Sequence, residues 1–488
     1  MRSRLEGARA ALAREPLLAA MVLAAAAVYA TYSIVRHTNL GTGGFDLGIF
    51  DQAVWHYSRL EEPASSIKGF SNVLGDHFSP IVALLAPLYW IWPDPRMLLL
   101  AQALLVASAT VPIFLFTRGR LGRAPAYLLT ASYGLFWGVH EAIGFDFHEV
   151  AFASPIVAWL VLAVDRRRWT GYWIAVALLL LVKEDLSFLV VFVGIYLATL
   201  REYRRAALTA AVGVGWYFLA TEVLIPAFSD GVSFQYWTYT QFGDELPEAA
   251  LNAITEPWRV AEVVVDDEQK VRTLGYLFLP FLALALCSRL VLLAIPLVAA
   301  RLLSTVENFW ETNYHYSLVL APILLMAAAD ALPRVLRLIR ERRRHAAAVS
   351  VSAAIAAINL GLATQFDLAD LTRSSFWTKD ASERDAEAVL ERVPPGESVA
   401  AQNNLAPHLA RRPCIRAMRL FRLNEPTESP RITGDPELIV GDLASPEMSD
   451  TLAPRRGRYR VVFREGSWAI LARAPGRGAR SPCEEFGS

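Results

Sequence analysis

In the first 365 residues, the arginine clusters lie in every second connection between apolar segments. This segregation of charge between alternate connections is the feature that most constrains the fold. The arginine clusters lie within residues 2–14, 118–123, 166–168, 201–205 and 334–344. Acidic, histidine-rich and aromatic segments occupy the other connections, at 45–52, 75–80, 140–149, 183–185 and 307–317. Loops rich in Lys and Arg stay in the cytoplasm. The pattern therefore predicts a protein that crosses a membrane many times, with its ionisable residues gathered at the outer face.

Eleven segments are apolar enough to be predicted spans, for which about 20 apolar residues are needed. The run 79–92 is short and rich in proline, so we predict an interfacial or re-entrant segment there. With a cytoplasmic N-terminus, eleven spans leave two long outer loops, 36–96 and 228–272, and place the C-terminus outside. The predicted spans are 16–35, 97–117, 124–140, 151–165, 169–183, 186–200, 205–227, 273–287, 289–303, 317–333 and 346–364.

Composition separates an all-α membrane domain at 1–365 from a polar C-terminal segment at 366–488. The chain is 54% hydrophobic, above the roughly 45–50% of soluble domains. Its formal net charge of zero hides a strong segregation of sign, so bulk charge says little about partners, and nothing in the sequence suggests nucleic acid. A helical pattern at 380–392 precedes short β-like runs, which predict a small α/β domain outside the membrane. Cys414 and Cys483 lie in this segment and can pair if it is extracytoplasmic, whereas Cys287 is predicted to be a core residue. The β-like runs are 397–402, 437–443, 459–466 and 467–473.

Two carboxylates in the first outer loop, Asp46 and Asp51, are the candidates for catalysis. A carboxylate at the membrane surface can act as a general base on a hydroxyl or hold a divalent cation. The alternatives are that Asp46 caps the helix that follows it and that Asp51 lies on a solvated face.

Histidines also concentrate on the predicted outer side. The segment 140–149 combines histidines with acids, and we predict Asp146, His148 and Glu149 as ligands of a divalent cation such as Mg or Mn. The chain has no HExxH motif there, so the segment does not predict a zinc protease.

The triplet Lys183–Asp185 separates two short apolar runs and is predicted to lie near the membrane interface, where ionisable residues are costly. Either these residues pair among themselves at the turn, or Lys183 receives a lipid-linked phosphate. The segment 307–317 offers rings for a sugar face and carboxylates for its hydroxyls, but would equally suit an interfacial aromatic belt. The predicted substrate-binding residues are His77, Lys183, Glu184, Asp185, Glu307, Trp310, Glu311 and His315.

Several motifs resemble the bacterial and archaeal membrane proteins grouped as domain-of-unknown-function family 2079, and the resemblance covers most of the chain. The motifs are FDLGIFDQAVWH (45–56), GDHFSPI (75–81), PLYWIWPDP (87–95), FDFHE (145–149) and SVAAQNNLAPHLARRP (398–413).

That family resembles the GT-C class of integral-membrane glycosyltransferases, which take sugars from polyprenyl-phosphate donors at the outer face. By position, the essential acidic residues of that class correspond to Asp46 and Asp51, and a second acidic site corresponds to Asp146. Here the two aspartates are five residues apart, so one helix would not place both on the same face. The resemblance therefore leaves open which of them is the base.

We expect a GT-C-like glycosyltransferase of the bacterial plasma membrane that moves a sugar from a polyprenyl-phosphate donor to an envelope acceptor. Asp46 would act on the acceptor hydroxyl, and Lys183 or a metal would stabilise the leaving phosphate. The alternatives are a transporter or flippase of a lipid-linked or anionic substrate, which would carry repeated halves that this sequence lacks, and a non-catalytic envelope assembly protein. Six residues are expected to line one cavity: Asp46, His77, Asp146, His148, Lys183 and His315.

Overall fold

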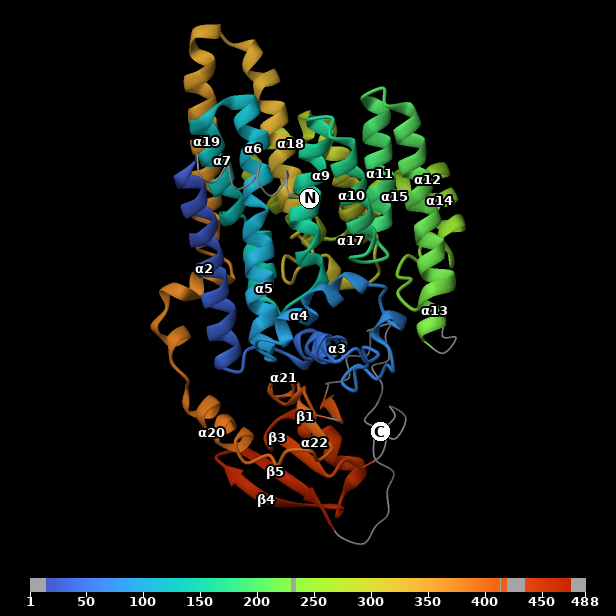
Figure 1. Cartoon of the computed structure of the whole chain (residues 1–488), viewed down its shortest axis with the longest axis vertical. Coiled ribbons are helices and arrows are strands. Elements are labelled where there is room, and N and C mark those ends of the chain that lie inside the picture. The colour runs from blue at the N-terminus through green and yellow to red at the C-terminus, as the bar shows by residue number, and fades with distance from the viewer. Residues whose placement is uncertain (1–14, 230–233, 413, 419–434, 475–488) are drawn as a thin grey trace.

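The computed structural model describes residues 15–229, 234–412, 414–418 and 435–474, and it places a helical unit above a small C-terminal sheet (Figure 1). Within these residues, four helical stretches are long and apolar enough to cross a membrane. They are α2 (Pro16–Thr38), α5 with α6 (Pro95–Ser108 and Thr110–Leu121), α12 through α13 (Tyr203–Leu219 and Ile225–Phe228) and α19 (Glu341–Ala363).

Most other predicted spans coincide with shorter helices, so the total of eleven remains a prediction. Helix α18 is buried along almost its whole length, as expected for a helix that is apolar on all sides. The short run after Ser79 forms a 3-10 turn and the single helical turn α4 (Ala86–Tyr89) rather than a span. The shorter helices are α7 (Arg123–Leu135), α8 (Trp137–Gly144), α9 (Ala153–Asp165), α10 (Trp169–Leu180), α11 (Leu186–Thr199) and α18 (Leu320–Val335).

The predicted spans 273–287 and 289–303 are not continuous helices. Helix α16 (Glu268–Phe278) ends before Pro280, and Leu282 and Ala283 then adopt positive φ angles of 54° and 53°. Short 3-10 segments continue to Leu293 (Leu284–Cys287 and Arg289–Leu293), and the first α-helix beyond them is α17 (Ile295–Leu302). Proline removes a backbone donor and disrupts a helix interior, which accounts for the break. Cys287 in this stretch is exposed rather than buried.

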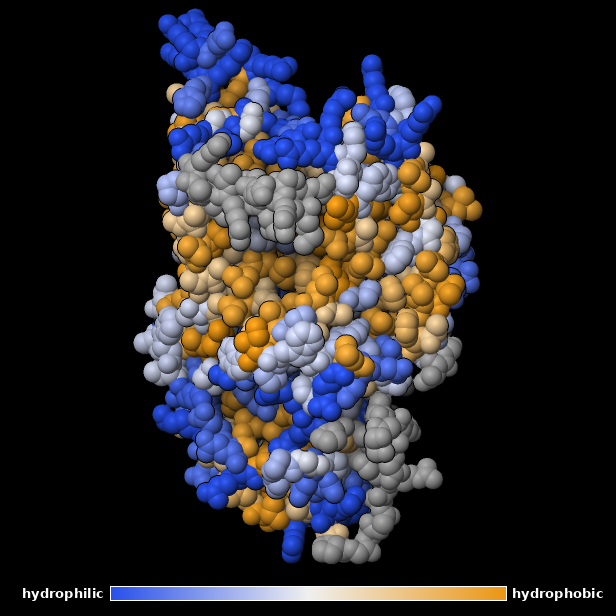
Figure 2. Space-filling view, in the orientation of Figure 1, coloured by the Kyte–Doolittle hydropathy of each residue, from blue (hydrophilic) through white to orange (hydrophobic). Residues whose placement is uncertain are grey.

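The arginine clusters that the structure describes, at 118–123, 166–168, 201–205 and 334–344, gather at the end of the helical unit that lies away from the sheet. Arg120 of α6 binds Asp165 at the end of α9 at 2.8 Å and Asp330 of α18 at 3.1 Å. Arg118 binds Glu15 at the start of α2. Figure 2 shows this hydrophilic end above a broad hydrophobic band, the arrangement expected of a protein embedded in a membrane.

The orientation in the membrane is a testable prediction. Single cysteines at Arg343 and Asp450, both exposed, should differ when an impermeant maleimide is added to intact cells. In a background that carries Cys287→Ala, Cys414→Ala and Cys483→Ala, the cysteine at 450 should react and the cysteine at 343 should react only after permeabilisation. The reverse pattern would contradict an extracytoplasmic C-terminal sheet.

The C-terminal sheet has the strand order β2-β1-β3-β5-β4. β1 pairs in parallel with β2 and β3, whereas β5 runs antiparallel to β3 and β4. The predicted helix and the four predicted strands are present, and only β2 was not predicted, because its four residues show no alternation. The boundary at residue 366 stays a prediction. The elements are α20 (Ala381–Leu390), β1 (Val399–Gln402), α21 (Ala406–Leu409), β2 (Ile415–Met418), β3 (Leu438–Asp442), α22 (Pro446–Leu452), β4 (Tyr459–Glu465) and β5 (Trp468–Arg473).

Candidate functional site

Asp46 lies where the first outer loop meets the sheet, in a single π-type turn (Gly44–Gly48) that leads into α3 (Ile49–Ser58). The residue before α3 is Gly48, and no side chain caps the helix there, so Asp46 is not its N-cap. The side chain of Asp46 is half-buried and forms no hydrogen bond or ion pair within the described part of the chain. Its carboxylate is therefore available to a ligand.

The C-terminal sheet holds the loop that presents Asp46. The N–H of Gly44 donates to the carbonyl oxygen of Asn403 at 2.8 Å, and the N–H of Phe45 donates to the Asn403 Oδ1 at 3.2 Å. A Cβ on Gly44 would lie 2.7 Å from that of Ala406, so glycine permits this close approach. Asn403 follows the carboxyl end of β1, which lies between its parallel neighbours β2 and β3. Open α/β sheets bind their ligands at the carboxyl ends of parallel strands. Here the membrane unit's own loop occupies that position.

The substitution Asn403→Ala should loosen the Asp46 loop without unfolding the protein. It removes the side-chain acceptor of Phe45 but keeps the main-chain bond to Gly44, so stability should fall by only about 1 kcal/mol. Amide exchange across residues 43–49 should become faster, as measured by mass spectrometry on protein in lipid nanodiscs. Asn404→Ala is the matched control, and equal exchange in both variants would contradict the positioning role of Asn403.

Asp146 supports the same loop from the helical unit. Its Oδ1 accepts from the Arg36 Nη1 at 2.6 Å, and its Oδ2 accepts from the N–H of Gly43 at 2.7 Å. Burial, with a smaller contribution from the nearby Asp46 carboxylate, raises the pKa of Asp146 to about 6 against the effect of Arg36. Asp146 therefore lies beside Asp46, with both of its oxygens already bound.

Lys183 reaches across to a different outer segment. Its Nζ lies 3.3 Å from the Glu149 Oε1, while the His148 Nδ1 lies 2.8 Å from the Glu149 Oε2. Burial opposes ionisation of Glu149, but the charges of His148 and Lys183 hold its pKa well below the usual range. His315 stacks on His148 with ring centroids 3.5 Å apart. The pairing of Lys183 within its own triplet, the alternative considered above, is not observed.

Glu184 also binds a separate loop. Its Oε1 lies 2.7 Å from the His77 Nδ1, and its Oε2 accepts from the N–H of Phe78 at 3.0 Å. The His77 ring stacks on Tyr236 of the second long outer loop, with centroids 4.1 Å apart. Lys68 in turn donates to the Tyr236 hydroxyl at 3.1 Å. Both long outer loops therefore contribute to this part of the protein.

These contacts join the predicted residues into one group near the sheet. Burial raises the pKa of Tyr316, the Asp46 carboxylate raises it further and Lys183 opposes the change, so both charges lie near this phenol. The structure brings together all six residues expected to line a cavity, although the cavity itself stays a prediction. We call the group the outer cluster: Asp46, His77, Asp146, His148, Glu149, Lys183, Glu184 and His315.

Asp51 does not contact the outer cluster. Its side chain is fully buried, its Oδ1 accepts from the Tyr89 hydroxyl at 2.5 Å, and its Oδ2 lies 4.0 Å from the Arg411 Nε. Burial raises the pKa of Asp51 to about 7. Its role as a second catalytic residue stays a prediction.

Four predicted substrate-binding residues also lie outside the outer cluster. Asp185 is exposed at the start of α11, and Glu307 is exposed as well. The Lys270 Nζ lies over the Trp310 ring, 4.1 Å from its centroid. Glu311 accepts from the Asn313 side chain. No hydrogen bond, ion pair or ring contact joins these four to the cluster within the described residues.

The predicted metal ligands do not converge on one point. Asp146 is turned toward Arg36, whereas His148 and Glu149 bind each other. Across residues 15–229, 234–412, 414–418 and 435–474, no group of three His, Cys, Asp or Glu side chains is arranged to hold a metal ion.

Sequence reasoning missed Lys68 and Asn403. The sequence did contain an indication for Lys68, because only four of the 47 basic residues are lysines and two of these, Lys68 and Lys183, lie in or beside the outer cluster. Asn403 lies within a motif that carries the family resemblance, but its hydrogen bond to Phe45 spans 358 residues.

The fold is shared with two solved structures of ArnT from Cupriavidus metallidurans. One, bound to undecaprenyl phosphate, superposes with a TM-score of 0.57 at 13% identity, covering 95% of this chain and 99% of ArnT. The apo structure gives 0.56 at 15% identity, with 95% and 98% covered. At such identities the likeness establishes the fold alone.

The sequence itself identifies the family. The chain belongs to the family of predicted membrane proteins known as DUF2079, whose family model matches residues 36–477. This confirms the resemblance inferred from the motifs. No curated protein sequence matches the chain significantly.

Proposed function

We propose that this protein is a membrane glycosyltransferase that moves a sugar from a polyprenyl-phosphate donor to an envelope acceptor at the outer face of the bacterial plasma membrane. The observation that carries the proposal is the outer cluster, in which the unpaired carboxylate of Asp46 lies near the buried Lys183–Glu149 pair. It is supported by the shared fold with ArnT, a GT-C glycosyltransferase whose structure contains undecaprenyl phosphate.

In the proposed reaction, the acceptor hydroxyl attacks the anomeric carbon of the donor sugar. A new carbon–oxygen bond forms to the acceptor, the bond from the anomeric carbon to the phosphate oxygen breaks, and polyprenyl phosphate leaves. Asp46 takes the hydroxyl proton as general base. Its loop is fixed on one side by Asn403 and on the other by Asp146, which keeps the base in position.

The leaving phosphate gains negative charge as the bond breaks. Lys183 would stabilise that charge, since its ammonium is oriented by Glu149 before the substrate binds. His77, bound to Glu184 and stacked on Tyr236, is a second group of fixed orientation on the same side.

The test uses the full chain in lipid nanodiscs with a panel of undecaprenyl-phosphate-linked monosaccharides as donors and a cell-envelope extract as the source of acceptor. Mass spectrometry measures the release of undecaprenyl phosphate. Wild type should release it from at least one donor, and Asp46→Asn should not. In sealed vesicles, movement of an intact lipid-linked sugar across the bilayer would instead favour a flippase. Neither cleavage nor movement would favour an assembly protein.

A further inference from the structure

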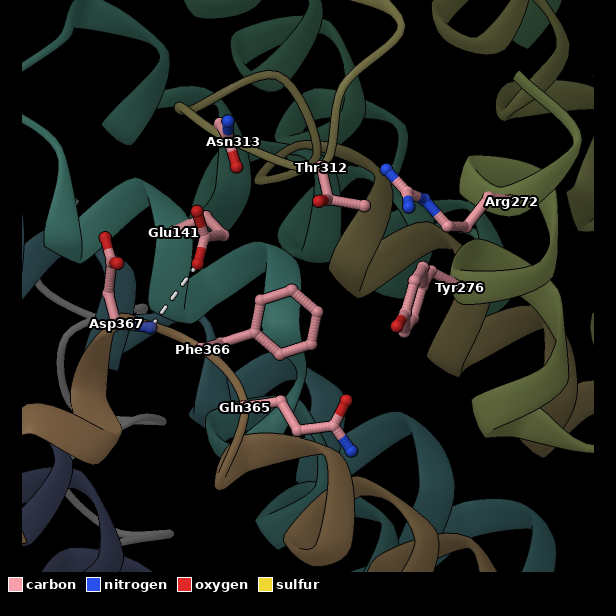
Figure 3. Close-up of a pocket in the computed structure, with 8 residues that line it drawn as sticks. All are labelled: Glu141, Arg272, Tyr276, Thr312, Asn313, Gln365, Phe366 and Asp367. Atoms are coloured by element: carbon pink, nitrogen blue, oxygen red, sulfur yellow. Dashed lines mark hydrogen bonds between the residues drawn. The ribbon is translucent and has the colours of Figure 1, made fainter. Parts of the chain in front are cut away.

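A polar cavity lies among residues of the helical unit that are not part of the outer cluster (Figure 3). Its volume is about 300 Å³, at the lower end for pockets that take small molecules. Four separate segments enclose it: α8, α16, the loop at residues 312–313 and the segment that follows α19. The lining residues that matter for its chemistry are Glu141, Arg272, Tyr276, Asn313, Phe366 and Asp367.

One side of the cavity is a fixed aromatic wall. The Phe366 ring stacks on Trp137 with centroids 5.5 Å apart and meets Tyr276 edge to face at 5.6 Å. The Trp137 indole N–H donates to the carbonyl oxygen of Tyr276 at 2.6 Å, which fixes the rings relative to one another. These rings therefore form a rigid border to a cavity whose lining is mostly polar.

The opposite side carries a buried acid with few partners. Glu141 is only 7% exposed, and its Oε1 accepts one long hydrogen bond, 3.4 Å, from the N–H of Asp367. No Lys, Arg or His lies within ion-pair distance of Glu141 in the described part of the chain. Buried polar groups normally have better partners, so this carboxyl is suited to a ligand that supplies them.

The carboxyl of Glu141 can also donate a proton in a hydrogen bond. Burial, followed by the charge of Asp367, raises the pKa of Glu141 to about 8. Near neutral pH the group is therefore mostly protonated, and a hydroxyl can serve as both its donor and its acceptor. The Asn313 amide nitrogen donates to Glu311, and Figure 3 shows the amide oxygen on the side of Glu141.

We infer that this cavity binds one neutral, hydroxyl-rich sugar ring of the acceptor. The acid and amide groups of the mostly polar lining suit the hydroxyls of a sugar, and the rigid rings limit the space beside it. The cavity is much larger than a bare cation, and its polar groups are spread over four segments rather than converging on one point. The identification of this sugar as part of the acceptor rests on the proposed glycosyl transfer, whereas binding of a sugar to the cavity can be tested independently.

The position of the cavity agrees with an acceptor subsite. Helix α8, which carries Glu141, leads directly to Asp146, and the residues 312–313 precede His315 on one loop. Phe145, between the two acids, packs edge to face against Tyr314. The cavity and the outer cluster therefore share two segments, so a sugar bound here would be held by the same elements that carry Asp146 and His315.

The binding test uses saturation-transfer NMR with the full chain in nanodiscs. The probes are millimolar methyl glycosides of glucose, galactose, mannose, N-acetylglucosamine and arabinose. At least one glycoside should receive saturation from the protein. Glu141→Leu and Phe366→Ala should each weaken the binding of that glycoside roughly tenfold or more, which for Glu141 is the scale of a lost buried hydrogen-bond partner. The control is Asp370→Asn. Asp370 is close to Asp367 in the sequence but pairs with Arg373, so this substitution should leave sugar binding unchanged.

Asp46→Asn separates this inference from the proposed function, because it should abolish transfer and leave glycoside binding intact. In the transfer assay, Glu141→Leu should raise KM for the acceptor, whereas kcat and KM for the donor should stay unchanged. Absence of saturation for all five glycosides, or binding that survives both pocket substitutions, would overturn the inference. Binding without any transfer would keep the sugar pocket and overturn only the proposed function.

Discussion

Asp46→Asn is expected to lower glycosyl transfer by roughly 100-fold or more, the usual contribution of a general base. Asn has the same shape but cannot accept the hydroxyl proton. Folding should be unaffected, because the Asp46 side chain has no partner in the described residues and does not cap α3. The measurement is transfer of labelled sugar from polyprenyl phosphate, with the membrane levels of each variant matched.

Asp46→Ala serves as the companion variant. If Asp46 acts as the base, Ala and Asn should be equally inactive and equally well folded. A structural role at a helix start would give the opposite pair of results, with Asn tolerated and Ala damaging to folding. Full activity of Asp46→Asn would transfer the proposed role to Asp51.

Lys183→Met is expected to cause a loss of comparable size, about 100- to 1000-fold in kcat, because it removes the positive charge proposed to stabilise the leaving phosphate. It also leaves Glu149 buried with His148 as its remaining charged partner, so the protein should become less stable. Lys379→Met, which breaks a pair with Glu387 beside the sheet, is the matched control and should retain activity.

The double variant Lys183→Met with Glu149→Gln separates catalysis from stability. Removing both charges leaves no uncompensated buried carboxylate, so thermal stability should recover toward wild type. Activity should stay low, since the ammonium is still missing. Recovery of activity together with stability would show that the pair is only structural.

The membrane class and the family were predictable because both follow from local sequence. Arginine clusters and uninterrupted apolar runs mark helices such as α2 and α19 without knowledge of the packing. The same reasoning failed at 273–303, where hydropathy alone did not weigh Pro280 and Pro296 against helix continuity.

The outer cluster was only partly predictable, for a related reason. His77 and Lys183 were recognised as ionisable residues in outer connections, a property of each segment alone. Their partners could not be inferred, because His77 and Glu184 are 107 residues apart in the chain and pairing depends on how the loops pack. The same holds for Asn403, whose importance follows from the sheet lying against the Asp46 loop.

The most direct test of the account is an electron cryo-microscopy structure of the full chain in nanodiscs with added undecaprenyl phosphate. We predict density for the phosphate in contact with Lys183 and next to the loop that carries Asp46, with the prenyl chain leading into the bilayer. Phosphate density at another part of the surface, with the outer cluster unchanged and the Lys183–Glu149 pair closed, would contradict it.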